Sequence, residues 1–194
     1  MSVPTESAPT AAAHASHTAT ALPRLSVPGN LLPNLREVLQ REVGSDVSAR
    51  ILHQVGRDAG SDFEARLRSR LDASPGELSP DDYFRELSET FDEMGWGTLT
   101  STRVHPGLCL IETSEWAEGD ANAPAREPSC HFTGGVFATL LAALAPAPIA
   151  VLEVTCRTRG DDACGFLFGS EDAIRGLHTL LVEGSTVDEA LERL

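Results

Sequence analysis

Three of the four cysteines in this chain lie near one glutamate, in a spacing that suits a metal ion. The residues are Cys130, Glu153, Cys156 and Cys164. Zinc in proteins takes four ligands from thiolate, imidazole and carboxylate groups, and a closed site rich in cysteine leaves no open position for catalysis. The four residues therefore indicate a structural zinc site rather than a catalytic one.

Local geometry can be worked out from the flanking strand patterns. A hairpin turn at Gly160 would place Cys156 opposite Cys164, where paired Cβ atoms are about 4.5–5.5 Å apart. Glu153 is harder to place, because residues three apart in a regular strand point to opposite faces. It reaches the same metal only if the strand bulges or ends near Thr155. From the residues alone, a Cys156–Cys164 disulfide and metal-free buried thiols remain alternatives.

The charge of such a site needs an explanation. A divalent ion with four ionised ligands carries about −2 in total. Arg157 and Arg159 lie beside the cluster in sequence and could offset this charge. The alternative is that both are ordinary solvated arginines of the hairpin.

The elements that must position these residues follow from apolar spacing. Gly56 and Gly60 lie one turn apart in a predicted helix, which indicates close approach of another helix or a ligand. Residues 117–128 predict a surface loop. The pattern predicts helices at 31–44, 47–71, 79–94 and 132–145, strands at 96–102, 108–112, 149–155 and 163–168, and helices starting at Ser170 and at a capping box Ser185–Asp188. This order favours an α+β fold in which helices cover an antiparallel sheet of about four strands.

Length and charge limit the classes of protein. We expect a disordered tail at 1–23 and one domain at 24–194. The formal net charge of −14 argues against nucleic acid and anionic membrane partners. Neither a spanning segment nor a secretory signal is apparent, so we expect a cytoplasmic protein with reduced cysteines. The absence of a phosphate loop, a dinucleotide fingerprint and a Ser-His-Asp pattern argues against an enzyme.

The run from Cys130 to Gly169 resembles the 4-vinyl reductase domain family. The matching features are a cysteine before a Gly-rich helix, Glu-x-x-Cys, a Gly-Asp turn and Cys-x-Phe. The segment 51–60 also resembles the family's N-terminal helix, and the resemblance covers roughly 31–182. The residues that carry the motif are Cys130, Gly134, Gly135, Glu153, Cys156, Gly160, Asp161, Cys164 and Phe166.

The resemblance implies a fold shared with the TRAPP subunits of vesicle tethering. In bacterial phenol-responsive activators the domain is the sensor: it binds an aromatic effector, dimerises and holds zinc through one glutamate and three cysteines. It therefore implies zinc at the four residues above, with a bulge at Glu153. The histidine and tryptophan that hold phenol in those sensors have no matched position here; His105, Trp96 and Trp116 lie in the region and are better interpreted as turn or core residues.

The expected function is a stand-alone sensor of a small apolar or aromatic ligand, acting as a homodimer through Phe63 and Leu67. Alternatives are a TRAPP-like interaction module that contacts a GTPase or scaffold protein without a ligand, and an accessory protein of tetrapyrrole metabolism. The ligand would lie beneath helix 132–145, where Gly134 and Gly135 would leave space. The tentative pocket is formed by Phe91, Trp96, Cys109, Gly134, Gly135, Leu140 and Leu141.

Overall fold

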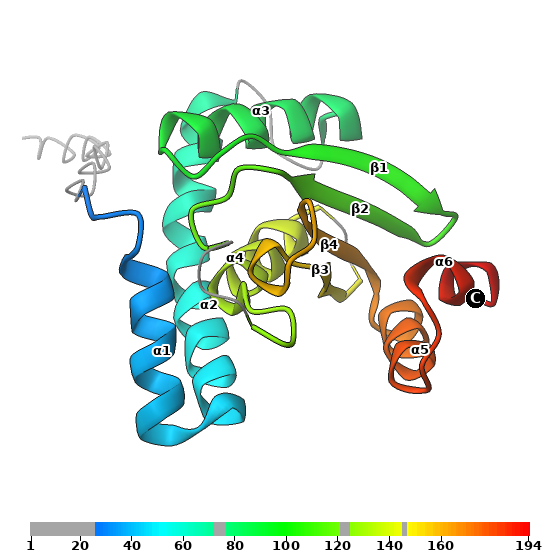
Figure 1. Cartoon of the computed structure of the whole chain (residues 1–194). Coiled ribbons are helices and arrows are strands. Elements are labelled where there is room, and N and C mark those ends of the chain that lie inside the picture. The colour runs from blue at the N-terminus through cyan, green and yellow to red at the C-terminus, as the bar shows by residue number, and fades with distance from the viewer. Residues whose placement is uncertain (1–25, 72–76, 121–124, 145–146) are drawn as a thin grey trace, which may run out of the picture.

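The computed structural model describes residues 26–71, 77–120, 125–144 and 147–194, so the predicted tail at 1–23 lies outside the described residues. The elements are α1 (Leu31–Val43), α2 (Ser45–Arg70), α3 (Pro80–Glu93), β1 (Thr100–His105), β2 (Leu108–Thr113), α4 (His131–Ala142), β3 (Ile149–Thr155), a 3-10 turn η2 (Arg157–Arg159), β4 (Cys164–Ser170), α5 (Glu171–Val182) and α6 (Val187–Glu192) (Figure 1). None of the helices in these ranges is long and apolar enough to cross a membrane.

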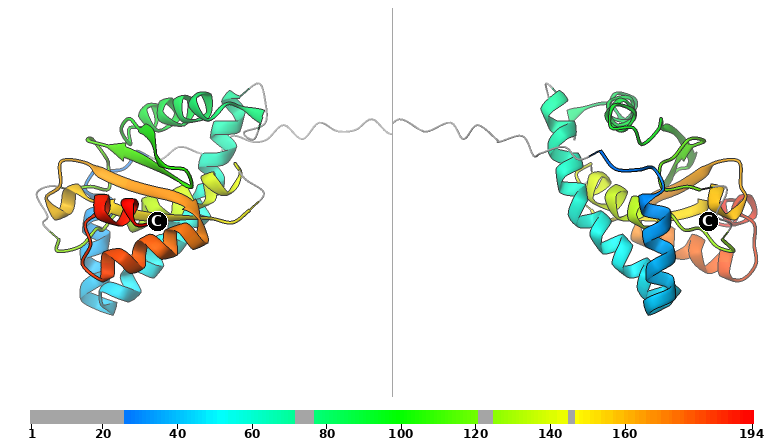
Figure 2. Two further views of the ribbon diagram at one scale, coloured as in Figure 1. Left: turned by 90° about the vertical axis from the view of Figure 1, so that its right-hand side faces the viewer. Right: turned by 60° about the vertical axis from the view of Figure 1, so that its left-hand side comes forward.

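The four strands form one sheet in the order β1-β2-β4-β3, with every neighbouring pair antiparallel. Side chains on one sheet face, such as Ile111 and Phe166, pack with α2, α3 and α4. Those on the other face, such as Leu108 and Leu167, pack with α5 and α6. Figure 2 shows these helices on opposite sides of the sheet. The predicted α+β fold is confirmed.

Glycines allow α2 and α4 to lie unusually close. A Cβ on Gly56 would lie 2.0 Å from the carbonyl oxygen of Phe132, and one on Gly60 would lie 2.6 Å from Cβ of Thr139. Another helix, not a ligand, therefore explains these two glycines. A Cβ on Gly135 would lie 2.1 Å from the carbonyl oxygen of His53. The expectation of free space at Gly135 is wrong, because the backbone of α2 fills it.

Several predicted boundaries were wrong. The first strand starts at Thr100 rather than Trp96, because Gly97 has φ of 115° and the Leu99 N–H donates to Oγ of Ser88 at 2.8 Å instead of entering the sheet. The last helix begins one residue later than predicted: Thr186 is its N-cap, and Glu189 completes the capping box. Helix α4 ends at Ala142 because tighter i→i+3 hydrogen bonds close its last turn.

The two residues predicted for dimer contact are buried inside the chain. Phe63 stacks on Phe91 with ring centroids 5.0 Å apart, and Leu67 is 1% exposed. Both belong to the face of α2 that packs on the core, so this prediction was wrong. The apolar residues that α2 does expose are Ile51 and Val55, one turn apart.

Candidate metal centre

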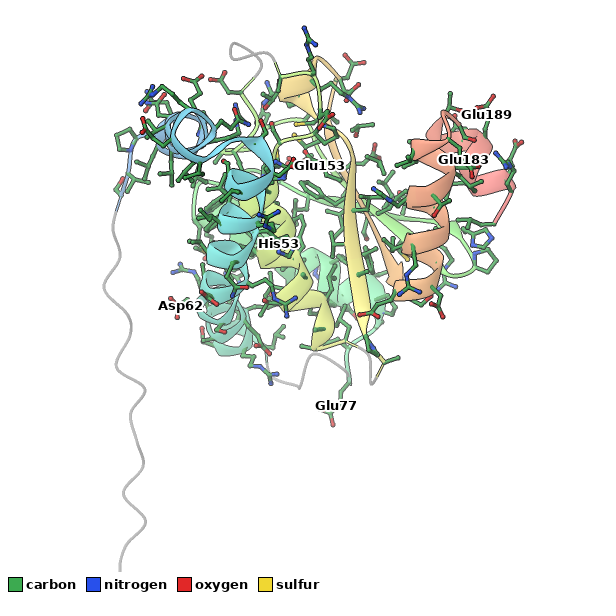
Figure 3. All side chains as sticks on the ribbon, turned by 90° about the horizontal axis from the view of Figure 1, so that it is seen from below. His53, Asp62, Glu77, Glu153, Glu183 and Glu189 are labelled. Atoms are coloured by element: carbon green, nitrogen blue, oxygen red, sulfur yellow. The ribbon has the colours of Figure 1, made fainter. Side chains whose placement is uncertain are left out.

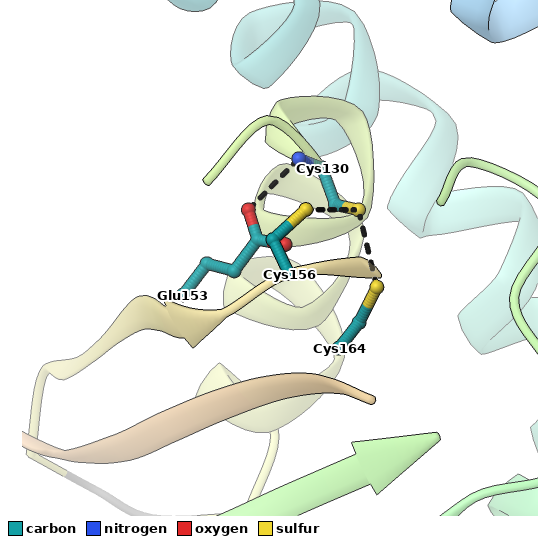
Figure 4. Close-up of side chains that lie close together, drawn as sticks. All are labelled: Cys130, Glu153, Cys156 and Cys164. Atoms are coloured by element: carbon teal, nitrogen blue, oxygen red, sulfur yellow. Dashed lines mark hydrogen bonds between the residues drawn. The ribbon is translucent and has the colours of Figure 1, made fainter. Parts of the chain in front are cut away.

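The four predicted ligands meet at one end of the sheet (Figure 4). Cys130 is the N-cap of α4, Glu153 lies on β3, Cys156 follows the end of β3, and Cys164 begins β4. One ligand atom from each residue lies within 4.8 Å of all the others. The three cysteines are free and at most 1% exposed. The structure therefore brings together a group of side chains that could hold a metal ion.

An irregularity in β3 lets Glu153 share the cluster with Cys156. Glu153 pairs with Phe166, but the next pair is Thr155 with Gly165, so β3 contains an extra residue. A Cβ on Gly165 would lie 2.5 Å from Oγ1 of Thr155, so the absence of a side chain there makes room for the irregular strand. The bulge predicted at this position is confirmed.

The turn after β3 holds Cys156 in place. The Cys156 N–H donates to Oδ2 of Asp161 at 2.7 Å. Arg159 donates to the same carboxylate at 2.9 Å and to the carbonyl of Val154 at 2.9 Å. Gly160 has φ of 105°, a conformation that glycine adopts without strain. The Gly-Asp turn is thus explained as a support for one ligand.

Hydrogen bonds connect the ligands. The Sγ of Cys130 lies 3.8 Å from that of Cys156 and 3.7 Å from that of Cys164. Oε2 of Glu153 accepts from the Cys130 N–H at 2.8 Å, while its buried Oε1 has no hydrogen-bond partner. A buried acceptor without a partner is costly, and a cation at the cluster would satisfy it.

Without a cation the four acids cannot all ionise together. Hydrogen bonds from Cys130 and Cys164 hold the pKa of Cys156 far below its usual range. Hydrogen bonding to Cys156 and Cys164, with burial, raises the pKa of Cys130 well above its usual value. Burial, together with the charge on Cys156, does the same to the pKa of Glu153. For Cys164, the hydrogen bond with Cys130 lowers the pKa, but hydrogen bonding to Cys156 and burial outweigh it and raise the pKa to about 12.

Sequence reasoning missed Glu118, which it assigned to a surface loop. Glu118 is 2% exposed, and its carboxylate accepts from the backbone N–H groups of Phe132 and Thr133 at 3.0 and 2.7 Å. It also accepts from Oγ1 of Thr133 at 2.6 Å. It therefore caps the start of α4, and burial raises its pKa to about 7. The loop composition is polar, and only the long-range contact shows that part of it is buried.

The loop also covers the cluster. A Cβ on Gly119 would lie 2.9 Å from Sγ of Cys164. The loop backbone therefore lies directly against a predicted ligand, and glycine is needed for that approach. This residue, like Glu118, had no recognisable sequence pattern.

The tentative ligand-pocket residues do not line one common space. Phe91 and Trp96 belong to an aromatic cluster with ring centroids 6.3 Å apart. Leu140 and Leu141 are fully buried in the core. Cys109 lies on β2 and packs at the margin of the same core, and burial raises the pKa of its thiol. Gly135 faces α2, and only Gly134 lines an open cleft.

His105, Trp96 and Trp116 are turn or core residues, as expected. Nδ1 of His105 accepts from the Gly107 N–H in the first hairpin turn at 3.4 Å. Nε1 of Trp116 donates to Oγ1 of Thr133 at 2.7 Å, and the ring is 3% exposed. Trp96 stacks on Phe132 with ring centroids 5.7 Å apart.

A cleft of about 810 Å³ opens beside the metal centre. It lies along β3, between α2 and α4 on one side and α5 and α6 on the other. Figure 3 shows His53 of α2 and Glu153 of β3 on the side of the molecule from which α5 also extends. Its lining combines polar groups with aliphatic ones and includes Cys130 and Glu153 of the cluster, together with His53, His131, Leu181 and Val182.

Comparison with known proteins supports the family resemblance. Residues 116–170 match the 4-vinyl reductase domain, a range that contains all four clustered residues. An uncharacterized protein of Methanocaldococcus jannaschii is 33% identical over 89 residues, 46% of this chain and 47% of that protein. The chain thus spans about half the length of the curated relative it matches.

Two solved structures share the fold. One is the phenol-responsive sensory domain of the transcription activator PoxR with phenol, with a TM-score of 0.62, 18% identity, and coverage of 80% of this chain and 82% of that one. The other is a vinyl-4-reductase family protein from Methanocaldococcus jannaschii, with a TM-score of 0.50, 22% identity, and coverage of 75% and 82%. At these identities the similarity establishes the fold.

Proposed function

Because residues 116–170 form a 4-vinyl reductase domain, we propose that this chain is a sensing domain that binds a small molecule, contains a structural zinc and acts as a homodimer. The observation that carries the proposal is the cleft beside the cysteine cluster. The shared fold with a phenol-responsive sensory domain supports it. Free cysteines suit a reducing compartment, which supports a cytoplasmic location.

Zinc suits the spacing of the sulfur atoms. Two thiolates bound at about 2.3 Å in tetrahedral geometry lie about 3.8 Å apart. The separations from Cys130 to Cys156 and Cys164 are 3.8 and 3.7 Å. Glu153 would supply the fourth ligand through Oε1, the oxygen without a partner. Zinc would let all four acids ionise and would tie the start of α4 to the second hairpin. It supplies stability and no chemical step.

The cleft suits a small ring with one polar group. Burial, with nearby arginines, lowers the pKa of both His53 and His131, so both imidazoles are neutral hydrogen-bonding groups at neutral pH. Val151, Leu181 and Val182 offer apolar contact on the same cleft. A neutral hydroxylated aromatic compound combines both properties. The ligand site is therefore proposed in this cleft rather than in the packed space beneath α4.

Gly134→Leu should block the cleft without disturbing the helix pair. A Cβ at Gly134 meets only Cδ2 of His53, at 3.8 Å, so the larger side chain would extend into the cleft. We expect the wild-type chain to bind phenol and the variant to lose at least about tenfold in affinity, or about 1.4 kcal/mol. Isothermal titration calorimetry with phenol as the probe measures this.

Gly29→Leu is the matched control, because a Cβ there meets nothing within 4 Å and Gly29 lies outside the cleft. It should bind phenol like the wild type. Phenol binding that survives Gly134→Leu, or a wild-type chain that binds no phenol, contradicts the proposed ligand site.

An exposed apolar surface on α1 and α2 suits the proposed homodimer. Leu31, Leu35 and Val38 are 40–45% exposed and follow helical spacing on α1, while Ile51 and Val55 are 38% and 47% exposed on α2. The two helices are antiparallel neighbours at the outside of the molecule (Figures 1 and 2). Self-association would cover these side chains, which we call the α1–α2 surface.

Charges on this surface should give a monomer. The double substitution Ile51→Glu and Val55→Glu places two like charges in the proposed interface, where they lack partners. We expect sedimentation velocity to show a dimer for the wild type and a monomer for the variant at micromolar concentration. Leu194→Glu, at an exposed apolar residue outside this surface, should leave the dimer intact. A monomeric wild type, or a dimeric double variant, contradicts the interface.

The second candidate is an interaction module without a ligand. The tightly packed space beneath α4, where Leu140 and Leu141 are fully buried, favours it. So does the exposed α1–α2 surface, which suits a protein partner. The phenol titration separates the two candidates, because only the sensing domain requires an open cleft.

A further inference from the structure

Arg36 is a buried cation that connects α1 to the metal centre. It is 4% exposed and is the only buried arginine in the described part of the chain. Its Nη1 donates to Oγ of Ser129 at 2.8 Å, across 93 positions of sequence. Burying an arginine is costly unless hydrogen bonds and negative charge compensate for it. The surroundings of Arg36 must therefore supply that compensation.

Ser129 places Arg36 one side chain away from the cluster. Ser129 is 2% exposed and directly precedes Cys130. Its Oγ lies 3.7 Å from Sγ of Cys156. The contacts thus run from Arg36 to Ser129 and then to two of the proposed ligands. A change in the position of Ser129 would change the contacts of both the cluster and α1.

Charge gives this connection a purpose. A zinc ion with three thiolates and one carboxylate carries about −2. Arg159 is already paired with Asp161, at 2.7 Å, and Arg157 meets Cys164 through its backbone N–H. Glu118 adds a buried acid that Arg36 also influences, because the charge on Arg36 opposes the rise in the Glu118 pKa. Arg36 is therefore the buried positive charge nearest to this group of acids on the α1 side.

The attachment of α1 depends strongly on this contact. Pro33 and Arg36 are the buried residues of α1, while Leu32 and Leu39 are half-buried against the core. A helix with so little apolar burial is readily loosened when its buried charge loses its partner.

We infer that Arg36 couples metal occupancy to the docking of α1, and so to the display of the α1–α2 surface. This inference rests on the proposed zinc site. Zinc fixes Cys130 and hence Ser129, and the charge that it maintains on the ligands attracts Arg36. Linkage is reciprocal: if zinc strengthens the docking of α1 by some factor, docking strengthens zinc binding by the same factor.

Hydrogen exchange and metal competition on the full chain test this coupling. Amides of α1 should exchange faster in zinc-stripped than in zinc-loaded wild type. Arg36→Gln should lower zinc affinity about 10–100-fold, the usual effect of losing a partner of a metal ligand. In that variant, zinc should no longer slow exchange in α1. Competition with a chromophoric chelator measures the affinity.

Arg41→Gln is the matched control, because Arg41 lies on the same helix, is exposed, and pairs only locally with Glu42. It should keep wild-type zinc affinity and wild-type protection of α1. Ser129→Ala should give an intermediate loss of affinity, since it removes the hydrogen bond but keeps the charge of Arg36.

The outcomes separate two failures. If the wild type binds no zinc, both the zinc proposal and the coupling are overturned. If it binds zinc but α1 exchanges equally fast with and without it, the coupling alone is overturned. That wild-type comparison decides the matter even if Arg36→Gln fails to fold. Unchanged zinc affinity in a folded Arg36→Gln variant also overturns it.

Discussion

Replacing Cys156 or Cys164 with serine should abolish metal binding and lower the Tm by roughly 10 °C or more. Both sulfurs are fully buried and belong to a cluster that joins α4 to the second hairpin. A preformed site rarely exists in the unfolded chain, so metal-binding energy is largely folding energy. Losing several kcal/mol shifts the Tm by about 2–4 °C per kcal/mol in a chain of this size. Calorimetry with zinc analysis measures both effects.

Cys109→Ser is the matched control. Cys109 lies on β2, outside the cluster, and is only half-buried. Its replacement should retain the metal and change the Tm little. Glu153→Gln should fall between these cases, since it loses a charge but keeps an oxygen. If Cys156→Ser and Cys109→Ser prove equally stable, the structural metal is refuted.

Acid should act like these substitutions. In the metal-free site the pKa of Cys130 and that of Cys164 are raised, so both thiols are protonated at neutral pH. A metal must displace these protons, and its affinity therefore falls as the pH falls. The stability that zinc contributes should decrease with falling pH in the wild type, and this decrease should be absent in Cys156→Ser.

Gly56→Ala should destabilise the chain by at least about 1–3 kcal/mol, the usual cost of overpacking a core. The new Cβ would lie 2.0 Å from the carbonyl oxygen of Phe132, a backbone atom that cannot move independently. Helices α2 and α4 would have to separate. Because Phe132 lies two residues after Cys130, zinc affinity should fall as well. Urea unfolding and chelator competition measure the two effects.

Gly134→Ala tests whether the clash, rather than any change of a helical glycine, is responsible. It lies on the facing helix, but its nearest neighbour would be Cδ2 of His53 at 3.8 Å. Alanine favours helix over glycine, so this variant should be as stable as the wild type or slightly more stable. A Gly56→Ala variant with wild-type stability would mean that α2 and α4 are not packed this closely.

Local patterns predicted the parts of the fold that depend on local chemistry. Ser79 before Pro80 gave the start of α3, and the side chain of Ser79 does cap that helix. The spacing of Glu153 and Cys156 required a bulge, and β3 contains one. In both cases the decisive interaction lies within a few residues, so the sequence contains the evidence.

Contacts between distant segments could not be predicted in the same way. Arg157 and Arg159 were expected to balance the metal charge because they adjoin it in sequence, whereas the buried cation is Arg36. Phe63 and Leu67 were assigned to the dimer because apolar periodicity does not distinguish a core from an interface. Gly135 was assigned to a pocket because a glycine that admits a ligand and one that admits a helix look alike in sequence.

The most direct test of the zinc proposal is elemental analysis of the wild-type chain, purified under reducing conditions without a chelator. The account predicts one zinc per chain, which is lost together with thermal stability when Cys156 is replaced. Zinc well below one per chain, with Cys156 and Cys164 recovered as a disulfide or as metal-free thiols in a fully stable protein, would contradict it.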